Sequence, residues 1–318
     1  MFFATSLLVI GLILLVYGAD RLVYSAAVLS RSLGIAPRII GCTVVSFGTS
    51  LPELMISITA ALNHENDLAV SNVIGSNIIN ILLVIGGAAL FKPISFHSTT
   101  LRRELPLLLT ATALCGALLA DNILSRRDGM ILLLAAVGYL VAVVNMSGRT
   151  LHPDGDSLTR QRLAELPESG GNTVAVLWLA LAFIIMPVSA YMVIDNAGVL
   201  ARQWGVGEWV IGLTVLSVGT SLPALATVIA GALKGENDIA LGNLIGSNIV
   251  NSLLVLCVPA LLSPGPLNPP AARRDYWVML AASVVLTGFC LSKRRRITSM
   301  MGGLLLCSFA VYITVLFI

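Results

Sequence analysis

Long apolar runs separated by short polar segments cover this chain from end to end. Each run is close to the length of about 20 residues that a helix needs to cross the hydrocarbon core of a bilayer. The pattern therefore predicts an all-α polytopic membrane protein. Ten membrane-spanning helices are expected near residues 2–19, 38–62, 68–90, 105–120, 129–145, 173–194, 207–233, 239–261, 275–292 and 300–317.

One polar segment, residues 146–172, is much longer than the others and divides the ten expected spans into two sets of five. Because it is too short to form a domain, we interpret it as a linker. The expected organisation is a first half at 1–145, the linker at 146–172 and a second half at 173–318. The first apolar run has neither a basic leader nor a small-residue cleavage site, so we expect a retained helix rather than a signal peptide.

The positively charged residues predict the orientation of the spans, because cytoplasmic loops of membrane proteins carry an excess of Lys and Arg. If the N-terminus lies outside, 14 of the 19 Lys and Arg residues fall in cytoplasmic loops and helix ends, and five fall on the opposite side. The distribution therefore predicts that both termini lie outside and that the linker lies in the cytoplasm.

The composition excludes several classes of protein. The chain has 318 residues, of which 57% are hydrophobic and 11% are charged, whereas soluble domains carry about 25% charged residues. An ordinary soluble enzyme and a disordered chain are both excluded. A net charge of +3 does not indicate nucleic-acid binding, and the five cysteines form no CxxC pair. Since the sequence has no P-loop and no HExxH motif, we expect neither an enzyme nor a resident cofactor.

An internal repeat is the strongest signal in the sequence. Residues 41–80 and 212–251 match at a constant offset of 171, with 24 identities in 40 positions. Because each half is expected to contain an odd number of helices, the two copies should enter the membrane in opposite directions. Inverted repeats of this kind are typical of secondary transporters, whose substrate site lies near the bilayer midplane where the repeats meet.

The repeated segment places oxygen-bearing side chains at membrane depth. Thr49 and Glu53 are four residues apart and share a helix face. Pro52 and Pro223 interrupt their helices and leave the carbonyls four residues earlier without a partner. Amide and hydroxyl side chains recur at intervals of four in the span that follows each copy of the first motif: Asn72, Ser76 and Asn80, and then Asn243, Ser247 and Asn251.

These groups suit a cation. Hydroxyl, amide, carboxylate and carbonyl oxygens are the hard ligands that Ca²⁺ takes, about six to eight at a time, and Na⁺ could use the same donors. Any one Ser, Thr or Asn could instead bond only to backbone or to a neighbouring helix. Glu53 is different, because a carboxylate within a span is costly and marks a functional site by default. The repeat as a whole therefore predicts a cation site.

Four short motifs resemble the two alpha-repeats of the cation/calcium exchanger superfamily, close to bacterial inner-membrane sodium/calcium antiporters. They are GTSLPE at 48–53, GSNIIN at 75–80, GTSLPA at 219–224 and GSNIVN at 246–251. The resemblance covers essentially the whole chain. It implies the sodium/calcium exchanger fold, with ten transmembrane helices arranged as two inverted five-helix repeats. It also implies a bacterial inner-membrane location with periplasmic termini.

The resemblance further implies a mechanism and a set of ligands. Two long helices would slide against a core with four cation positions, and alternating access would exchange Ca²⁺ for Na⁺. The expected partners are these cations and membrane lipids, with no obligate protein partner. The implied ligands are Thr49, Ser50, Glu53, Ser76 and Asn80 in the first copy, Thr220, Ser221, Ser247 and Asn251 in the second, and the backbone carbonyls near Ser46 and Ser217.

One position departs from the family pattern. Ala224 stands where the second copy of GTSLPE would have its glutamate, so Ca²⁺ would meet one carboxylate instead of two and should bind more weakly. The other acids considered lie near span ends and are not obvious replacements: Asp20, Asp195, Glu208, Glu236 and Asp238. Three alternatives stay open: a monovalent cation/proton antiporter in which Glu53 carries the proton, a transport-impaired member of the family, and a passive channel.

Overall fold

The computed structural model describes residues 2–34, 37–95, 101–148, 172–203, 217–267, 269–291 and 296–316, and these residues are mainly helical. Most of the predicted linker, residues 207–216 of the seventh expected span, and Glu208 lie outside the described residues. Helices are the expected outcome for apolar segments in a bilayer, because a helix satisfies its backbone hydrogen bonds internally.

The first half begins with one long helix and continues with two interrupted ones, in which η denotes a π-helical segment. Its elements are α1 (Phe2–Leu33); α2 (Pro37–Ile40), η1 (Gly41–Val45), α3 (Ser46–Thr49) and α4 (Leu51–Leu62); α5 (Asn66–Ile79), η2 (Asn80–Ile85) and α6 (Gly86–Phe91); β1 (Ile94–Ser95); α7 (Leu101–Leu118); β2 (Ile123–Leu124); and α8 (Arg126–Gly148). π-Helical turns inside α-helices often occur at functional sites.

The described part of the second half has a closely similar order. Its elements are α10 (Asn172–Gln203); α12 (Ser217–Thr220) and α13 (Leu222–Lys234); α14 (Asn237–Val250), η4 (Asn251–Val255) and α15 (Leu256–Leu262); β3 (Gly265–Pro266); α16 (Pro269–Leu291); β4 (Arg296–Ile297); and α17 (Ser299–Leu316). The described parts of all ten predicted spans therefore lie mostly in helices. Among the described residues, five helices are long and apolar enough to cross a membrane, and a sixth span is added if the bent pair Gly41–Thr49 and Leu51–Leu62 counts as one.

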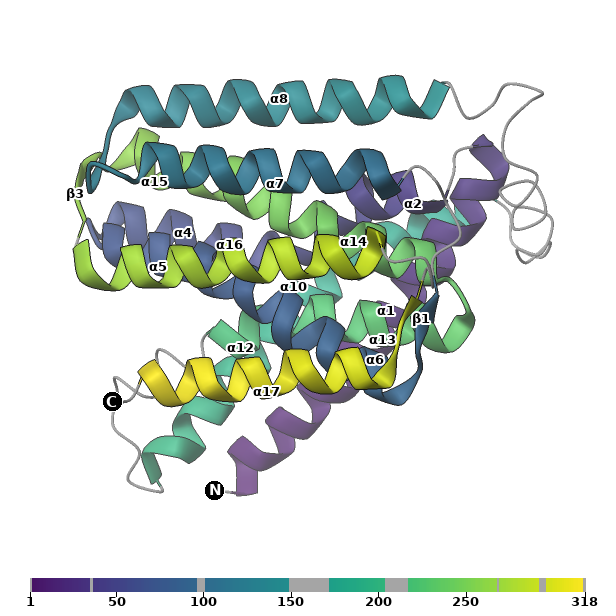
Figure 1. Cartoon of the computed structure of the whole chain (residues 1–318). Helices are drawn as coiled ribbons and strands as arrows, with labels where there is room; N and C mark the ends of the chain where they lie inside the picture. The colour runs from purple at the N-terminus through teal and green to yellow at the C-terminus, as the bar shows by residue number, and fades with distance from the viewer. Residues whose placement is uncertain are drawn as a thin grey trace.

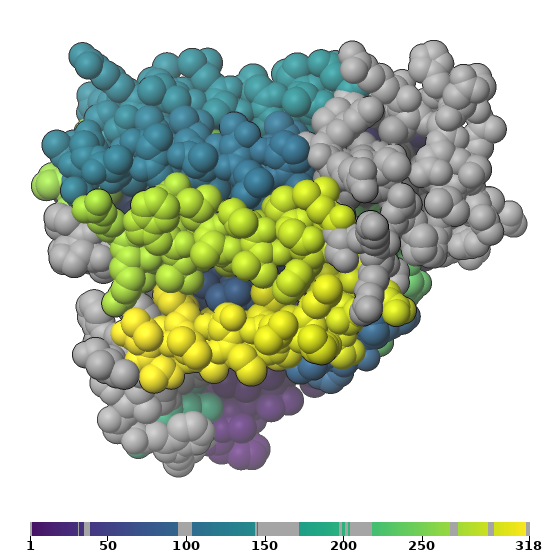
Figure 2. Space-filling model, in the orientation of Figure 1, coloured from purple at the N-terminus to yellow at the C-terminus, as the bar shows by residue number. Residues whose placement is uncertain are grey.

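The two interrupted helices that run from α5 to α6 and from α14 to α15 form the centre of the bundle. Their apolar windows are 78% and 83% buried, whereas those of α1 and α10 are only 28% buried. α7, α8 and α16 pack around this centre (Figure 1), and their apolar side chains join those of α5 and α14 in one core. On the face drawn in Figure 2 the surface is hollowed between α16 and α17.

Two small strand pairs connect the halves at opposite ends of the bundle. β1 pairs with β4, and β2 pairs with β3, both antiparallel. β1 and β3 occupy equivalent positions in the two halves, since their residue numbers differ by the repeat offset of 171. In Figure 1 they nevertheless lie at opposite ends of the molecule, while the start of α1 and the end of α17 lie toward the same end.

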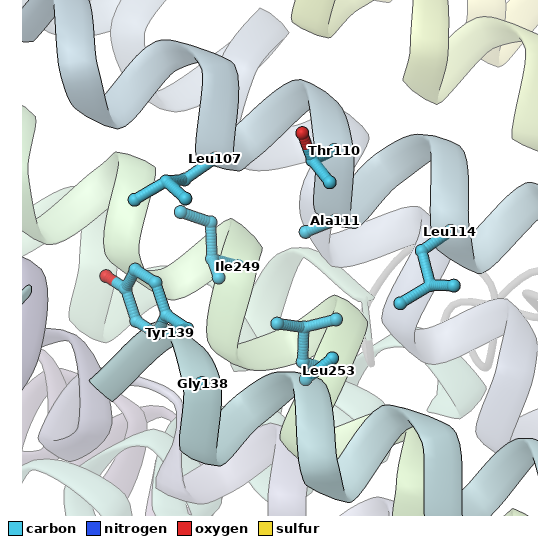
Figure 3. A pocket seen from close by; sticks show the side chains of 9 residues that line it. Leu107, Thr110, Ala111, Leu114, Gly138, Tyr139, Ile249 and Leu253 are labelled. Carbon is cyan, nitrogen blue, oxygen red and sulfur yellow. The ribbon is translucent and has the colours of Figure 1, made fainter. Parts of the chain in front are cut away.

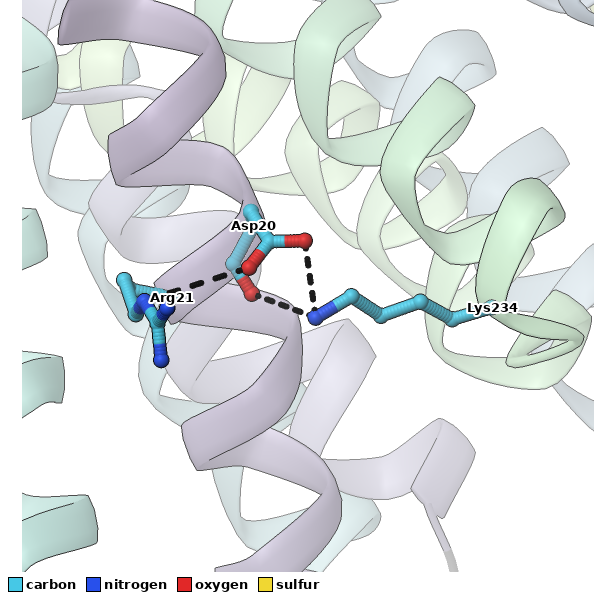
Figure 4. A network of polar contacts seen from close by, with 3 residues as sticks. All are labelled: Asp20, Arg21 and Lys234. Atoms are coloured by element: carbon cyan, nitrogen blue, oxygen red, sulfur yellow. Dashed lines mark hydrogen bonds and ion pairs between the residues drawn. The ribbon is translucent and has the colours of Figure 1, made fainter.

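α1 is longer than predicted. The expected span stopped at residue 19, just before the charged residues Asp20 and Arg21, but the helix continues to Leu33. Asp20 Oδ1 lies 2.8 Å from Lys234 Nζ on α13, and the Asp20 backbone carbonyl accepts a hydrogen bond from the same ammonium (Figure 4). The Arg21 guanidinium lies 5.1 Å from the ring of Trp178 on α10. Partners on neighbouring helices therefore allow these polar residues to remain inside a long helix.

Gly246 sets a very close approach between α14 and the η1–α3 segment of the first interrupted helix. A Cβ atom built on Gly246 would lie 2.7 Å from Cys42 Cα, and closer still to the Cys42 carbonyl and the Ser46 hydroxyl. Backbone atoms cannot move away as the end of a flexible side chain can. A side chain at this position would therefore push the two halves apart.

We predict that Gly246→Ala lowers the unfolding temperature in detergent by several degrees, because overpacking costs about 1–3 kcal/mol. Gly138→Ala is the matched control, since Gly138 also lies inside a helix but a Cβ there meets nothing within 4 Å. The control should be neutral or slightly stabilising, because Ala is the better helix former by about 1 kcal/mol. Equal unfolding temperatures for the two variants would contradict the packing argument.

Candidate cation-binding site

Two helix breaks and two π-helical junctions bring the repeated motifs together. The first interrupted helix, which runs from α2 to α4, bends by 51° at Ser50, between α3 and α4. Ser221 makes the equivalent break between α12 and α13, and Asn80 and Asn251 begin η2 and η4. A proline two residues after each of the two serines accounts for the breaks, because it cannot donate the helical hydrogen bond.

Nearly all of the predicted ligands are buried at this junction. The ten whose side chains are described are at most 2% exposed: Ser46, Thr49, Ser50, Glu53, Ser76, Asn80, Thr220, Ser221, Ser247 and Asn251. The side chain of Ser217 lies outside the described residues. Such complete burial of polar groups requires partners, either within the protein or bound to it.

Hydroxyl groups of the two repeats meet in a reciprocal pattern. Thr49 Oγ1 lies 3.0 Å from Ser247 Oγ, and Thr220 Oγ1 lies 3.4 Å from Ser76 Oγ. The second pair is the first with the two repeats exchanged. Thr49 also donates to Asn243 Oδ1 at 2.8 Å. The Thr49 and Thr220 hydroxyls, which the sequence placed in separate copies, therefore both lie at the interface between the two repeats.

A second reciprocal contact involves Asn77 and Asn248, two residues that the sequence analysis missed. Asn77 Nδ2 donates to the Asn248 backbone carbonyl at 3.2 Å, and Asn248 Nδ2 donates to the Asn77 carbonyl at 3.4 Å. Contacts across a self-complementary interface occur in reciprocal pairs, and here each residue contacts its own equivalent in the other repeat. The available signal was the asparagine that follows Gly-Ser in both copies of the second motif.

Several buried polar atoms of the cluster have no hydrogen-bond partner in the structure. The oxygen atoms in this group are Ser50 Oγ, Glu53 Oε2, Asn72 Oδ1, Asn77 Oδ1, Asn80 Oδ1, Ser221 Oγ and Asn251 Oδ1. An unpartnered buried polar atom costs about 1–3 kcal/mol, and more if it is charged. A cation coordinated by some of these oxygens would remove that cost. The amide nitrogens of Asn243 and Asn251 are also unpartnered, but a nitrogen that carries protons cannot bind a cation.

Glu53 is the acid of this cluster. Its carboxyl group interacts with the Ser76 side chain, and its backbone carbonyl accepts a hydrogen bond from Asn72 at 3.4 Å. Ala224, the equivalent residue of the second repeat, is 2% exposed. No group of three or more His, Cys, Asp or Glu side chains gathers anywhere in the described part of the chain. The site therefore combines one carboxylate with neutral oxygens.

Two of the acids considered above, Asp20 and Asp195, do not replace the missing glutamate. Asp20 is paired with Lys234, and Asp195 is exposed. Glu104, which the sequence analysis did not single out, is fully buried on the first turn of α7. It accepts a hydrogen bond from the thiol of Cys42, one helical turn before Ser46. Glu104 is therefore joined through Cys42 to the interrupted helix that carries the first copy of the motif.

A groove of about 220 Å³ lies between α7, α8 and the α14–η4 segment (Figure 3). Its lining is mostly apolar, with Leu107, Leu114 and Ile249 among the side chains that face it. The hydroxyls at its edge are already engaged, because Thr110 donates to the Pro106 carbonyl and Tyr139 donates to the Cys42 carbonyl. The groove therefore lacks the oxygen ligands that a cation requires.

Comparison with known proteins identifies relatives over the full length of the chain. The family model for sodium/calcium exchanger proteins matches residues 3–145 and 174–318. The chain is 51% identical to the inner membrane protein YrbG of Escherichia coli K12, with 100% of this chain and 98% of the relative covered. It is 44% identical to the putative antiporter CaxA of Alkalimonas amylolytica, with 100% and 99% covered.

A solved structure of the sodium-calcium exchanger NCX_Mj has the same fold. It superimposes with a TM-score of 0.83 at 28% identity, over 98% of each chain. The family consists of transporters rather than enzymes. A buried oxygen cluster at the junction of two repeated motifs, together with these full-length similarities, leads to one conclusion: this chain is a membrane protein of the sodium/calcium exchanger family.

Proposed function

We propose that the protein is a secondary active antiporter that exchanges Ca²⁺ for Na⁺ or H⁺ by alternating access. The observation that carries this proposal is the set of buried, unpartnered oxygens around Glu53 at the meeting point of the two repeats. The relatives named as antiporter and exchanger support the same class of activity. The transported ions are substrates, and the mechanism uses no resident cofactor.

The proposal includes the architecture that transport requires. Residues 1–145 and 173–318 would form two inverted five-helix repeats, joined by a cytoplasmic linker at 146–172, with both termini in the periplasm. The reciprocal contacts across the repeats and the placement of β1 and β3 at opposite ends support the inversion. The family model does not match residues 146–173, which nearly coincide with the proposed linker. The excess of Lys and Arg supports the orientation.

In this mechanism the two helix breaks and the two π-helical junctions supply the ligands. Glu53 would provide the one formal negative charge, and hydroxyl and amide oxygens would complete the shell of about six to eight that Ca²⁺ takes. The proposed ligand side chains are Thr49, Ser50, Glu53, Ser76, Asn80, Thr220, Ser221, Ser247 and Asn251, with backbone carbonyls near Ser46 and Ser217. Reciprocal contacts across the interface would have to rearrange as the site opens to one side and then the other.

Ala224 favours a second candidate function. With one carboxylate, a bound Ca²⁺ keeps about one uncompensated positive charge in a low-dielectric site, whereas one Na⁺ or H⁺ is neutralised by Glu53. A monovalent cation/proton antiporter, or a member of the family with impaired transport, is therefore the alternative. A passive channel would share the oxygen ligands but would not require a counter-ion.

The central experiment measures ⁴⁵Ca²⁺ and ²²Na⁺ uptake into proteoliposomes under an imposed Na⁺ or pH gradient. We expect saturable uptake that depends on the counter-ion and falls at least tenfold in Glu53→Gln. Glu65→Gln is the matched control, because Glu65 is exposed at the turn before α5, and it should retain wild-type flux. Uptake that is driven by a pH gradient without sodium would identify H⁺ as the counter-ion. A current that does not depend on a counter-ion would identify a channel, and the absence of any flux would identify a transport-impaired member of the family.

The same substitution should have the opposite effect on stability when cations are absent. A buried carboxylate with an unpartnered oxygen destabilises the empty site, so Glu53→Gln should raise the unfolding temperature in detergent at pH 9 with choline as the only cation. Adding Na⁺ or Ca²⁺ should stabilise the wild type and leave the variant unchanged. A variant that still responds to these ions would show that Glu53 is not a ligand.

Restoring the second acid should strengthen Ca²⁺ binding. Ala224→Glu places a carboxylate opposite Glu53, so we expect the Ca²⁺ concentration for half-maximal uptake to fall at least tenfold while that for Na⁺ changes less. Ala224→Gln is the control, because it adds the same volume without the charge. Unchanged or weaker Ca²⁺ affinity in Ala224→Glu would mean that residue 224 does not face the bound ion.

A further inference from the structure

A chain of three hydrogen-bonding groups links the two repeats and ends at one of the proposed ligands. Asn248 of α14 donates from Nδ2 to the backbone carbonyl of Asn77 at 3.4 Å. Its Oδ1 accepts a hydrogen bond from Nδ2 of Asn80 at 3.0 Å. All three residues are 1% exposed, so water does not compete for these contacts.

The direction of these hydrogen bonds follows from the Asn77 backbone carbonyl, at which the series begins. A backbone carbonyl can only accept, so Asn248 must present its amide nitrogen to Asn77 and its oxygen to Asn80. Asn80 must then donate with its own nitrogen. The Asn80 oxygen is consequently the end of the amide that points away from Asn248, and it has no partner within the protein. One backbone carbonyl therefore determines which end of Asn80 remains available to a cation.

The equivalent series of hydrogen bonds, from Asn77 to Asn251, does not form in the other repeat. Asn77 corresponds to Asn248, but its Nδ2 donates to Ser252 Oγ at 2.8 Å and to the Asn248 carbonyl. Asn251 corresponds to Asn80, and neither end of its amide has a partner. The position equivalent to Ser252 in the first repeat is occupied by Ile81, which offers no hydroxyl. Asn80 is therefore held in one orientation, and Asn251 is not.

We propose that Asn248 is a positioning residue that holds the Asn80 side-chain oxygen ready for the transported cation. The inference rests on the proposed function, in which Asn80 is a ligand. Without Asn248 the Asn80 amide can rotate and present its protons, which repel a cation. Because Glu53 and Asn80 belong to the same repeat, this repeat supplies both the charge and the oriented amide, and it forms the stronger half of the site.

The test compares Asn248→Leu with Asn77→Leu, which remove equally buried amides at equivalent positions. Both should lower the unfolding temperature. We expect the half-maximal concentration of Na⁺ or Ca²⁺, measured by exchange in proteoliposomes and by cation-dependent shifts of the unfolding temperature, to rise about tenfold in Asn248→Leu. It should change less than about twofold in Asn77→Leu, since Asn77 orients no proposed ligand. The maximal rate should fall less than threefold in both.

A double-mutant cycle identifies the route of the effect. In the Asn80→Ala background, Asn248→Leu should cause no further rise in the half-maximal concentration. An undiminished effect there, or equal rises in Asn248→Leu and Asn77→Leu, would overturn the positioning role while leaving the proposed function intact. If neither the unfolding temperature nor the flux of the wild-type protein changed with Na⁺ or Ca²⁺ concentration, the proposed function itself would be contradicted.

Discussion

Polar groups buried in a membrane must find partners within the protein, because hydrocarbon offers none. This constraint explains why the two copies of the motif lie against each other. The hydroxyls of Thr49 and Thr220 each meet a serine of the opposite copy, and Asn77 and Asn248 exchange hydrogen bonds through their backbone carbonyls. The close approach at Gly246 makes these contacts possible. The apolar helices around this centre bury it, and the oxygens that remain unpartnered give it the capacity to bind a cation.

Much of the architecture could be predicted from the sequence because the bilayer allows few solutions. Apolar runs of about 20 residues indicated helices, and the structure is mainly helical. The comparisons confirm the predicted family of membrane proteins. The repeat also indicated which segments would hold polar groups, and the described ligand candidates are indeed buried together. Hydrophobicity could not reveal the length of α1, because the partners of Asp20 and Arg21 lie on other helices, α13 and α10.

Other features of the site could not be read from spacing alone. Asn77 follows Ser76 directly, so a search for residues four apart on one helix face passes over it, although its contacts depend on the opposite repeat. Glu104 lies one residue before the span expected at 105–120, and its hydrogen-bond partner Cys42 lies 62 residues earlier in the chain. Pairwise contacts between distant segments decide both cases. Burial can be predicted from local patterns, whereas partners generally cannot.

The differences between the two similar copies carry more information than their similarity. Twenty-four of 40 positions agree, and most of the proposed ligands have the same residue type in both copies. At the equivalent of Glu53 the second copy has Ala224 instead of an acid, and just beyond the repeated segment Ser252 accepts a hydrogen bond from Asn77 where the first copy has Ile81. Under the proposed function, both differences would make the second copy the weaker contributor of cation ligands. The site would then hold a cation mainly through Glu53 and Asn80 of the first copy, and a single carboxylate neutralises a cation of low charge better than one of high charge.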